Sequence, residues 1–332
     1  MFHVAIVESI HTNAMDIIKQ NKNYSYEIIE NIHEDNLIKK LKKCDAIALR
    51  TAPLTEKIIN SCDNLKIVSR HGVGFDNVDL NTLNLRGIPL TITINANAVT
   101  VSEHVLAMMF YFNKKVHLFD NSVRNNKWDE FKIFNNKIIT INSELFKKTL
   151  VILGFGRIGK ELAKRCLAFD MQVLVFDPYV NDQIFIDHNV KRLSTLDEGI
   201  AHADFLSIHL PLSDETKNLI DINNLKKMKK NAFVINTSRG GIINENDLNK
   251  ALDNNIISGA GLDVFTEEPL NYNNLLLKNK KVVLTPHSAA LTSECWLRMG
   301  QETIRNIIDF FDNNLKNTVV VNKDSIKINE LK

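Results

Sequence analysis

Short apolar runs rich in β-branched residues alternate with segments of helical period over residues 1–93. The strand candidates are HVAIVES (residues 3–9), YSYEIIE (24–30), DAIALRT (45–51), LKIVSRHG (65–72) and IPLTIT (88–93). The helical segments between them are NAMDIIKQN (13–21), EDNLIKKLKKC (34–44) and DLNTLNLRG (79–87). Alternation of this kind is typical of βαβ units, so this part of the chain predicts a parallel sheet with helices on its faces.

The pattern changes after Thr93. Residues 97–126 keep a helical period and contain neither glycine nor proline. Such a segment predicts one helix, long enough to lead from one domain into another, and it places a domain boundary near residue 98.

A second series of strands begins at Leu150. Its six candidates are TLVILG (149–154), QVLVFD (172–177), DFLSIHL (204–210), AFVINTS (232–238), GAGLDVF (259–265) and KVVLTPH (281–287). A last helical segment, residues 293–315, precedes NTVVVN (317–322) and is long enough to return to the first domain. We therefore expect a domain of residues 99–290 to be inserted into a domain made of residues 1–98 and 291–332.

Composition narrows the possible partners. The chain has 332 residues, of which 44% are hydrophobic and 24% charged, enough to bury the cores of two domains. Because 41 basic residues nearly balance 39 acidic ones, no strong net field would attract nucleic acid or an anionic membrane. Small molecules and other copies of the chain remain as partners.

The four cysteines, at positions 44, 62, 166 and 295, are far apart in the sequence and form no metal-ligand or redox pair. This fits reduced thiols, and the opening MFHVAIVES resembles a strand rather than a leader peptide. No run of about 18 apolar residues, the length of a membrane span, is present. The sequence therefore predicts a cytoplasmic protein without a metal site.

The stretch TLVILGFGRIGKELAKRC joins a strand to a helix through three glycines. Gly154 permits a tight turn, Gly156 lets the backbone approach a pyrophosphate, and Gly159 lets helix and strand pack closely. Asp177 follows Gly159 by 18 residues, at the end of the next strand, where a carboxylate can bind a ribose diol. This context predicts a dinucleotide site, and the negative charge of Asp177 favours NAD over NADP.

Polar residues follow the last three predicted strands. Arg239 lies in INTSRGG, Glu268 in GLDVFTEEP and His287 in LTPHSAA. The carboxyl ends of the strands of a doubly wound sheet border its binding crevice, so these side chains should meet there. An enzyme that oxidises a hydroxy acid needs a proton acceptor for the hydroxyl and a cation for the carboxylate.

These motifs together resemble the D-isomer-specific 2-hydroxyacid dehydrogenases, the family of phosphoglycerate dehydrogenase and hydroxypyruvate reductase. The resemblance rests on GFGRIG…DPY, HLPL…T, NTSRGG, GLDVFTEEP and TPHSA, and in the first half on SRHGVGFDNVDL and ANAVTVSEHVLAMM. It covers nearly the whole chain in motif order. The fold class implied is α/β with two doubly wound parallel-sheet domains, a Rossmann NAD-binding domain inserted into a flavodoxin-like substrate-binding domain.

The resemblance implies a catalytic set of Arg239, Glu268 and His287. His287 would take the hydroxyl proton as hydride leaves C2 of the substrate, Glu268 would orient the imidazole, and Arg239 would hold the substrate carboxylate and polarise the carbonyl. The residues expected to bind NAD are Gly154, Gly156, Arg157, Ile158, Gly159, Asp177, His209, Pro211, Thr237, Ser238, Asp263, Ser288, Ala289 and Ala290. His104 is expected to pack or to support the site, and Met108 and Met109 to lie in the core.

On the substrate side, Gly72 and Gly74 permit an open turn whose N–H groups could bind an anion. The resemblance puts the substrate carboxylate at Val73 and Gly74. Arg50, Arg70 and His71 are the candidates for contacting the far end of the substrate, although Arg70 could equally pair with an acid outside the site.

Two function classes stay open. The first is an NAD-dependent D-2-hydroxyacid dehydrogenase whose substrate is a phosphorylated or sulfonated acid, hydroxypyruvate or glyoxylate. The second is an NAD-binding co-repressor, because such proteins resemble this family and keep the same three residues. Formate dehydrogenases of this fold have glutamine where Glu268 stands, which makes formate an unsuitable substrate.

Residues 103–141, with Trp128, are expected to form the arm of a homodimer, because long excursions from a sheet are usually functional.

Overall fold

The computed structural model describes residues 1–127 and 142–326. The chain divides into two compact units, which are described separately below. The first unit is Met1–Asn97 with Leu291–Lys332, and the second unit is Ala98–Ala290.

The first unit is built on a five-stranded sheet in which every pair is parallel. Its strands are β1 (Phe2–Val7), β2 (Tyr24–Ile29), β3 (Ala46–Leu49), β4 (Ile67–Arg70) and β5 (Leu90–Thr91). All five lie where the apolar runs predicted strands. The order β2-β1-β3-β4-β5 is that of a flavodoxin-like sheet, so this part of the fold prediction is confirmed.

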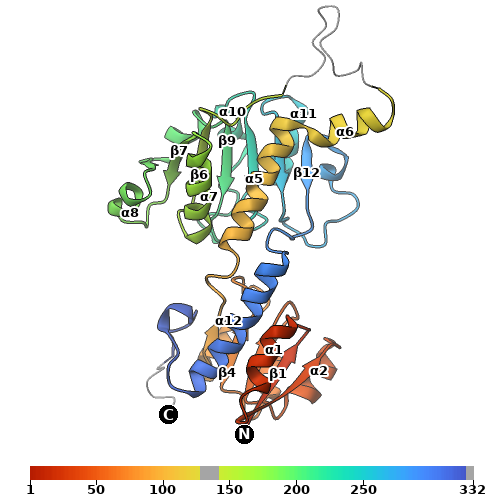
Figure 1. The fold of residues 1–332 in the computed structure, drawn as a ribbon, viewed down its shortest axis with the longest axis vertical. Helices are drawn as coiled ribbons and strands as arrows, with labels where there is room; N and C mark the ends of the chain where they lie inside the picture. The colour runs from red at the N-terminus through yellow and green to blue at the C-terminus, as the bar shows by residue number, and fades with distance from the viewer. Residues whose placement is uncertain (128–141, 327–332) are drawn as a thin grey trace, which may run out of the picture. The chain divides into compact units, whose positions relative to one another are not determined.

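Helices cover both faces of this sheet because its strands are apolar on both sides. Val4 and Ile6 pack with α1 (Thr12–Lys19) and α12 (Ser293–Phe311), whereas Ala5 and Val7 pack with the helices on the other face. Those helices are α2 (Glu34–Leu41), α3 (Glu56–Ser61) and α4 (Leu80–Leu85). Figure 1 shows α1 and α12 side by side, and a Cβ on Gly300 of α12 would lie only 2.9 Å from the Cβ of Ala14. After η3 (Asn317–Val319), Val321 N donates to Leu90 O, which attaches the last described residues to β5.

The second unit contains a parallel sheet of seven strands in the order β12-β11-β10-β9-β6-β7-β8. The strands are β6 (Thr149–Leu153), β7 (Gln172–Phe176), β8 (Lys191–Arg192), β9 (Phe205–Ile208), β10 (Phe233–Asn236), β11 (Gly259–Leu262) and β12 (Val282–Leu284). Numbered within the unit, the first six run 3-2-1-4-5-6, the Rossmann order. The six predicted strands are confirmed, and β8 is an additional edge strand of two exposed residues, too short to produce an apolar pattern.

The helices of the second unit also form two layers (Figure 1). One face of the sheet packs with α5 (Ala98–Lys114), α7 (Arg157–Ala168) and α8 (Asp182–Asp187). The other face packs with α9 (Leu196–Ile200), α10 (Ile222–Lys227) and α11 (Glu245–Asp253). A short 3₁₀ helix, η2 (Leu275–Lys278), precedes β12.

The single long helix predicted over residues 97–126 is wrong. It is two helices, α5 and α6 (Val116–Arg124), separated by Lys115, which adopts the left-handed conformation with φ 48°. Asn113 is the last buried residue of α5, and its carbonyl accepts a hydrogen bond from Ser143 N. Beyond Asn113, packing against the core no longer favours continuation of the same helix. A sequence without glycine or proline gives no indication of such a break. The rest of the predicted dimer arm, residues 128–141 with Trp128, lies outside the described residues.

Within the described ranges, no helix combines the length and the apolar character needed to cross a membrane. Met108 and Met109 are buried in the core of the second unit, as predicted.

Each unit contains one histidine whose environment strongly favours the neutral imidazole. Burial, together with the smaller effect of the nearby charge of Arg70, lowers the pKa of His71 in the first unit to about 4. Burial alone lowers the pKa of His209 in the second unit to about 4. Since an unfolded histidine titrates near 6.5, the unfolded chain binds more protons than the folded chain between these pH values.

The contribution of these two histidines to stability should therefore fall as the pH is lowered from about 6.5 to about 4 and should change little below that. A difference of roughly 2.5 between folded and unfolded pKa values corresponds to about 3 kcal/mol per histidine. Urea unfolding midpoints at pH 7 and pH 5 check this. His71→Asn and His209→Asn should each reduce the loss between the two pH values, and equal losses in wild type and both variants would contradict it.

Candidate active site

The glycine loop connects β6 to α7 at the point where the strand order of the second unit reverses. Gly154 has φ 90°, and a Cβ there would lie 2.6 Å from the carbonyl oxygen of His209, which follows β9. A Cβ on Gly159 would overlap Gly154 O and approach the Cγ2 of Ile152 to 3.3 Å. Gly156 differs, because a Cβ there would meet no heavy atom of the described residues within 4 Å. Gly154 and Gly159 thus serve packing, while Gly156 faces open space.

Asp177, at the end of β7, is fixed by the backbone of this loop. Its Oδ2 accepts a hydrogen bond from Phe155 N at 2.7 Å, and its Oδ1 accepts one from Tyr179 N at 2.9 Å. The hydroxyl of Tyr179 donates to Glu215 Oε2 at 2.9 Å. Each carboxylate oxygen of Asp177 keeps a lone pair for a further donor, such as a ribose hydroxyl.

Two buried polar atoms just after the neighbouring strands β9 and β10 have no hydrogen-bond partner among the described residues. They are Nδ1 of His209, whose Nε2 lies 2.8 Å from Ser207 Oγ, and Oγ1 of Thr237. Because buried polar groups are nearly always paired, such atoms indicate a missing ligand or water. With open space at Gly156, the free N–H groups at the start of α7 and the fixed carboxylate of Asp177, these residues fit a nicotinamide dinucleotide.

His287 and Glu268 form a hydrogen-bonded pair. The imidazole Nδ1 lies 2.7 Å from Glu268 Oε2, and Oε1 of the same carboxylate accepts from Phe265 N at 2.9 Å. His287 has φ 50°, a conformation that costs energy in a residue other than glycine and that persists where the surrounding structure fixes it. Its side chain is 53% exposed. The glutamate therefore orients the ring through Nδ1 and leaves Nε2 to exchange a proton.

Arg239 lies in the loop after β10, which is shaped by Asn236. The amide oxygen of Asn236 accepts from Ser238 N at 3.0 Å and Ser238 Oγ at 2.8 Å, and its Nδ2 donates to Arg239 O at 2.8 Å. A Cβ on Gly240 would overlap the backbone at Phe265, so the loops after β10 and β11 are in contact. Asn236 was not predicted from the sequence, because its role depends on these local hydrogen bonds.

Asp263, at the end of β11, holds the loop that carries His287. Its side chain is 1% exposed. Its Oδ1 accepts from Thr285 Oγ1 at 2.5 Å and Ser288 N at 2.8 Å, and its Oδ2 accepts from Ala289 N at 2.9 Å. The carbonyl of Asp263 also accepts from His287 N at 2.8 Å. The family resemblance implies that Asp263 binds the cofactor. The structure shows in addition that its carboxylate holds the backbone of the loop that carries His287.

The other residues expected at the cofactor lie at the start of α7 and in the loops that follow β9 and β12. Arg157 and Ile158 begin α7, and the carbonyl of Pro211 accepts a hydrogen bond from Thr216 Oγ1 at 2.7 Å. Ala290 follows the loop held by Asp263. The neighbouring Glu267 is exposed and is not part of the His287 pair. No cluster of metal-binding side chains occurs in the described part of the chain.

The substrate-side candidates of the first unit follow β3 and β4. The guanidinium carbon of Arg50 lies 4.5 Å from the centroid of the Trp296 ring, and the imidazole of His71 meets the same ring edge to face at 4.9 Å. His71 is 3% exposed, and its Nε2 has no partner among the described residues. Trp296, on α12, was not predicted as part of this cluster. Arg70 donates to His71 O.

Glu8 fills the crevice between β1 and β3, where the strand order of the first unit reverses. Its carboxylate accepts hydrogen bonds from Thr51 N, Thr51 Oγ1 and Ala52 N at 2.5–2.7 Å, and lies 3.9 Å from Arg50 Nη1. These hydrogen bonds lower the pKa of Glu8, although its partial burial works in the opposite direction. The carboxylate thus occupies the position at which a ligand of a flavodoxin-like sheet would bind.

The turn at residues 72–74 is only partly as predicted. Gly72 has φ 139° and requires glycine, but Gly74 is not among the glycines with positive φ. Val73 is 37% exposed. Among the described residues, none accepts a hydrogen bond from the N–H of Val73 or Gly74, so both groups can bind an anion.

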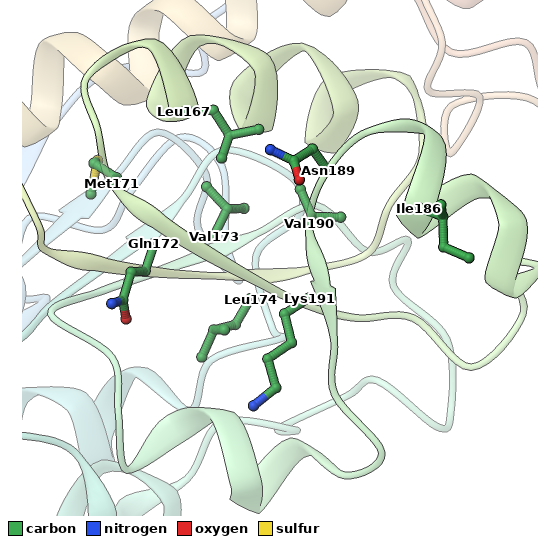
Figure 2. A pocket seen from close by; sticks show the side chains of 9 residues that line it. All are labelled: Leu167, Met171, Gln172, Val173, Leu174, Ile186, Asn189, Val190 and Lys191. Atoms are coloured by element: carbon green, nitrogen blue, oxygen red, sulfur yellow. The ribbon is translucent and has the colours of Figure 1, made fainter.

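A shallow apolar hollow in the second unit lies away from these residues. It is lined by Leu167, Met171, Gln172, Val173, Leu174, Ile186, Asn189, Val190 and Lys191 (Figure 2). Gln172 begins β7, so the hollow is at the amino-terminal ends of the parallel strands, whereas the glycine loop and His287 follow carboxyl-terminal ends. It is therefore separate from the candidate active site.

Comparisons with known proteins agree with this arrangement. Residues 106–289 match the model of the D-isomer specific 2-hydroxyacid dehydrogenase, NAD binding domain. D-3-phosphoglycerate dehydrogenase of Archaeoglobus fulgidus is 35% identical over 307 residues, which are 92% of this chain and 56% of that protein. Glyoxylate reductase of Korarchaeum cryptofilum is 33% identical over 293 residues, 88% of this chain and 87% of that protein.

Among solved structures, D-lactate dehydrogenase from Aquifex aeolicus, complexed with NAD and lactic acid, aligns with a TM-score of 0.80 at 26% identity, covering 96% of this chain and 98% of that one. The chain spans about half the length of the phosphoglycerate dehydrogenases it matches. The matched region contains the glycine loop, Asp177, Arg239, Glu268 and His287. The chain belongs to the D-isomer specific 2-hydroxyacid dehydrogenase family and contains its NAD-binding domain.

Proposed function

We propose that the chain is an NAD-dependent oxidoreductase that transfers a hydride between nicotinamide and C2 of a D-2-hydroxyacid or the corresponding 2-oxoacid. The observation that carries this proposal is the pair of His287 and Glu268, at 2.7 Å, on loops at the same sheet edge as the glycine loop of a family NAD-binding domain. The comparisons give no support to the co-repressor alternative.

His287 is the proton acceptor when the hydroxyacid is oxidised. As the C2–H bond breaks and C2 becomes a carbonyl carbon, the hydroxyl proton passes to Nε2 of the imidazole. Glu268, bonded to Nδ1–H, stabilises the resulting imidazolium. In the reduction of a 2-oxoacid, the same nitrogen returns the proton to the oxygen. Bound NAD or NADH supplies the hydride acceptor or donor.

Arg239 is the cation for the substrate. Its guanidinium has donors in a planar fork that matches a carboxylate, and the same charge stabilises negative charge on the C2 oxygen. Asn236 and Ser238 hold the loop, which limits the positions that the side chain can reach. The role of Arg239 is to bind and polarise the substrate, because a guanidinium offers hydrogen-bond donors and no acceptor.

Asp177 selects NAD. Its carboxylate accepts the ribose hydroxyls, while its charge repels the 2′-phosphate of NADP. The remaining cofactor contacts proposed are those of Gly156, Arg157 and Ile158 with the pyrophosphate. His209, Pro211, Thr237, Ser238, Asp263, Ser288, Ala289 and Ala290 are proposed to surround the nicotinamide half.

The substrate class is a small D-2-hydroxyacid. Similar proteins are named D-3-phosphoglycerate dehydrogenase, glyoxylate reductase and D-lactate dehydrogenase, and the compounds in these names are 2-hydroxyacids or, for glyoxylate, a 2-oxoacid. In the first unit, Val73 and Gly74 offer N–H groups to a carboxylate, and Arg50 and His71 contact the remainder of the substrate. We also propose that the protein is cytoplasmic and forms a homodimer with residues 103–141 in its interface. Sedimentation equilibrium at micromolar concentration tests the assembly, and a monomer would contradict it.

Initial rates with 2-oxoacids and NADH or NADPH, and with D-3-phosphoglycerate and NAD, test the function. NADH should be preferred. His287→Asn should lower kcat by about 10²–10⁴-fold, the usual contribution of a positioned acid–base group, while NADH binding measured by fluorescence stays within a few fold. An unchanged kcat would remove His287 from the mechanism, and inactivity of the wild-type protein on every acid would reject the function.

Two alanine substitutions in the glycine loop should separate cofactor binding from folding. Gly156→Ala should leave the melting temperature nearly unchanged, because its φ of −73° suits alanine and the space is open, but should weaken NADH binding. Gly159→Ala should destabilise the protein by about 1–3 kcal/mol through overpacking against Gly154 O. Equal melting temperatures of the two variants would contradict this division of roles.

A further inference from the structure

A histidine outside the catalytic set is connected to the loop that carries His287. His104 lies on α5, and its Nε2 is 3.2 Å from Thr285 Oγ1. Thr285 Oγ1 donates in turn to Asp263 Oδ1 at 2.5 Å. Asp263 accepts the N–H groups of Ser288 and Ala289, which follow His287 directly.

The packing of α5 brings His104 to this position. Met108, one turn later on the same face of α5, packs against Gly261 of β11 so closely that a Cβ on the glycine would lie 2.7 Å from Met108 Sδ. The glycine therefore lets α5 approach the strand that ends at Asp263. The side chain of His104 is 22% exposed, and its Nε2 is also 3.9 Å from Asp263 Oδ1.

The hydrogen bonds fix which atoms donate. A hydroxyl has one proton, and a carboxylate only accepts, so Thr285 gives its proton to Asp263 and must accept from His104. His104 therefore carries a proton on Nε2, whichever charge state it has. The direction of donation runs from His104 through Thr285 to Asp263, and each donor polarises the next.

We propose that His104 is a positioning residue, which acts through Thr285 and Asp263 to hold the strained loop that places His287 for proton transfer. A left-handed φ persists only where the surroundings fix it, and here those surroundings include the carboxylate and the amides of Ser288 and Ala289. The effect on turnover rests on the proposed function, whereas the effect on the loop does not.

Four variants test this proposal. His104→Leu removes the donor at similar volume, and His104→Gln retains an N–H donor near the same position. Thr285→Val removes the hydroxyl that links His104 to Asp263. Lys164→Gln is the control, because Lys164 is exposed on α7, the helix that packs against α5, and lies outside the proposed dimer interface.

His104→Leu should lower kcat about threefold to tenfold, the range expected for one hydrogen bond, with KM for NADH unchanged. His104→Gln should restore kcat to within about twofold, since its amide can replace the lost donor. The double variant His104→Leu with Thr285→Val should lose no more than Thr285→Val alone, because the two residues act in series. If the two losses multiply, His104 acts independently and the proposal fails.

Hydrogen exchange of the Ser288 and Ala289 amides gives a measurement that does not require activity. Both amides should exchange faster in His104→Leu and Thr285→Val, and at the wild-type rate in Lys164→Gln and His104→Gln. Unchanged exchange in His104→Leu would overturn the proposal even if turnover fell. If the wild-type protein is inactive on all acids, the proposed function fails, and the exchange rates still decide the role of His104.

Discussion

The carboxylate of Asp263 is the interaction on which the candidate active site depends. An ionised carboxylate with 1% exposure is unfavourable unless nearly all of its hydrogen-bonding capacity is used. Here the hydroxyls of Thr285 and Ser288 and two backbone N–H groups use it, and both amides belong to the residues just after His287. Burial of this charge thus fixes the backbone of the loop, and the loop holds the imidazole 2.7 Å from Glu268.

Polar side chains also fix the backbone of loops through hydrogen bonds at the ends of other strands. Asn236 shapes the loop of Arg239 through three hydrogen bonds, Asp177 fixes the glycine loop through Phe155 N, and Glu8 holds the loop after β3. Each buried or half-buried polar group ties a loop to the carboxyl end of a parallel strand. The chemistry proposed for His287 and Arg239 therefore relies on side chains that do no chemistry themselves.

Much of this could be predicted from the sequence, because the relevant constraints are local. The apolar period of β1 and β6 and the glycines of the turn involve residues close together in the sequence, and Asp177 could be predicted because it follows the turn at the spacing of a dinucleotide-binding motif. What could not be predicted depends on contacts between distant residues. The two-residue strand β8 has no pattern, Lys115 breaks a helix where burial ends, and the partner of Asp263 at Thr285 is 22 residues away. Gly74 seemed to require a special conformation only because it stands near Gly72.

A crystal structure of the Asp263→Asn variant tests the role of the buried carboxylate most directly. Asparagine has nearly the same shape but turns one acceptor into an N–H₂ donor, so at least one of the donors now facing Asp263 must lose its partner. The buried-carboxylate model predicts that His287 leaves its φ near 50° and that its Nδ1 moves beyond hydrogen-bond distance of Glu268 Oε2. A variant loop that keeps this φ and the 2.7 Å separation would contradict the model.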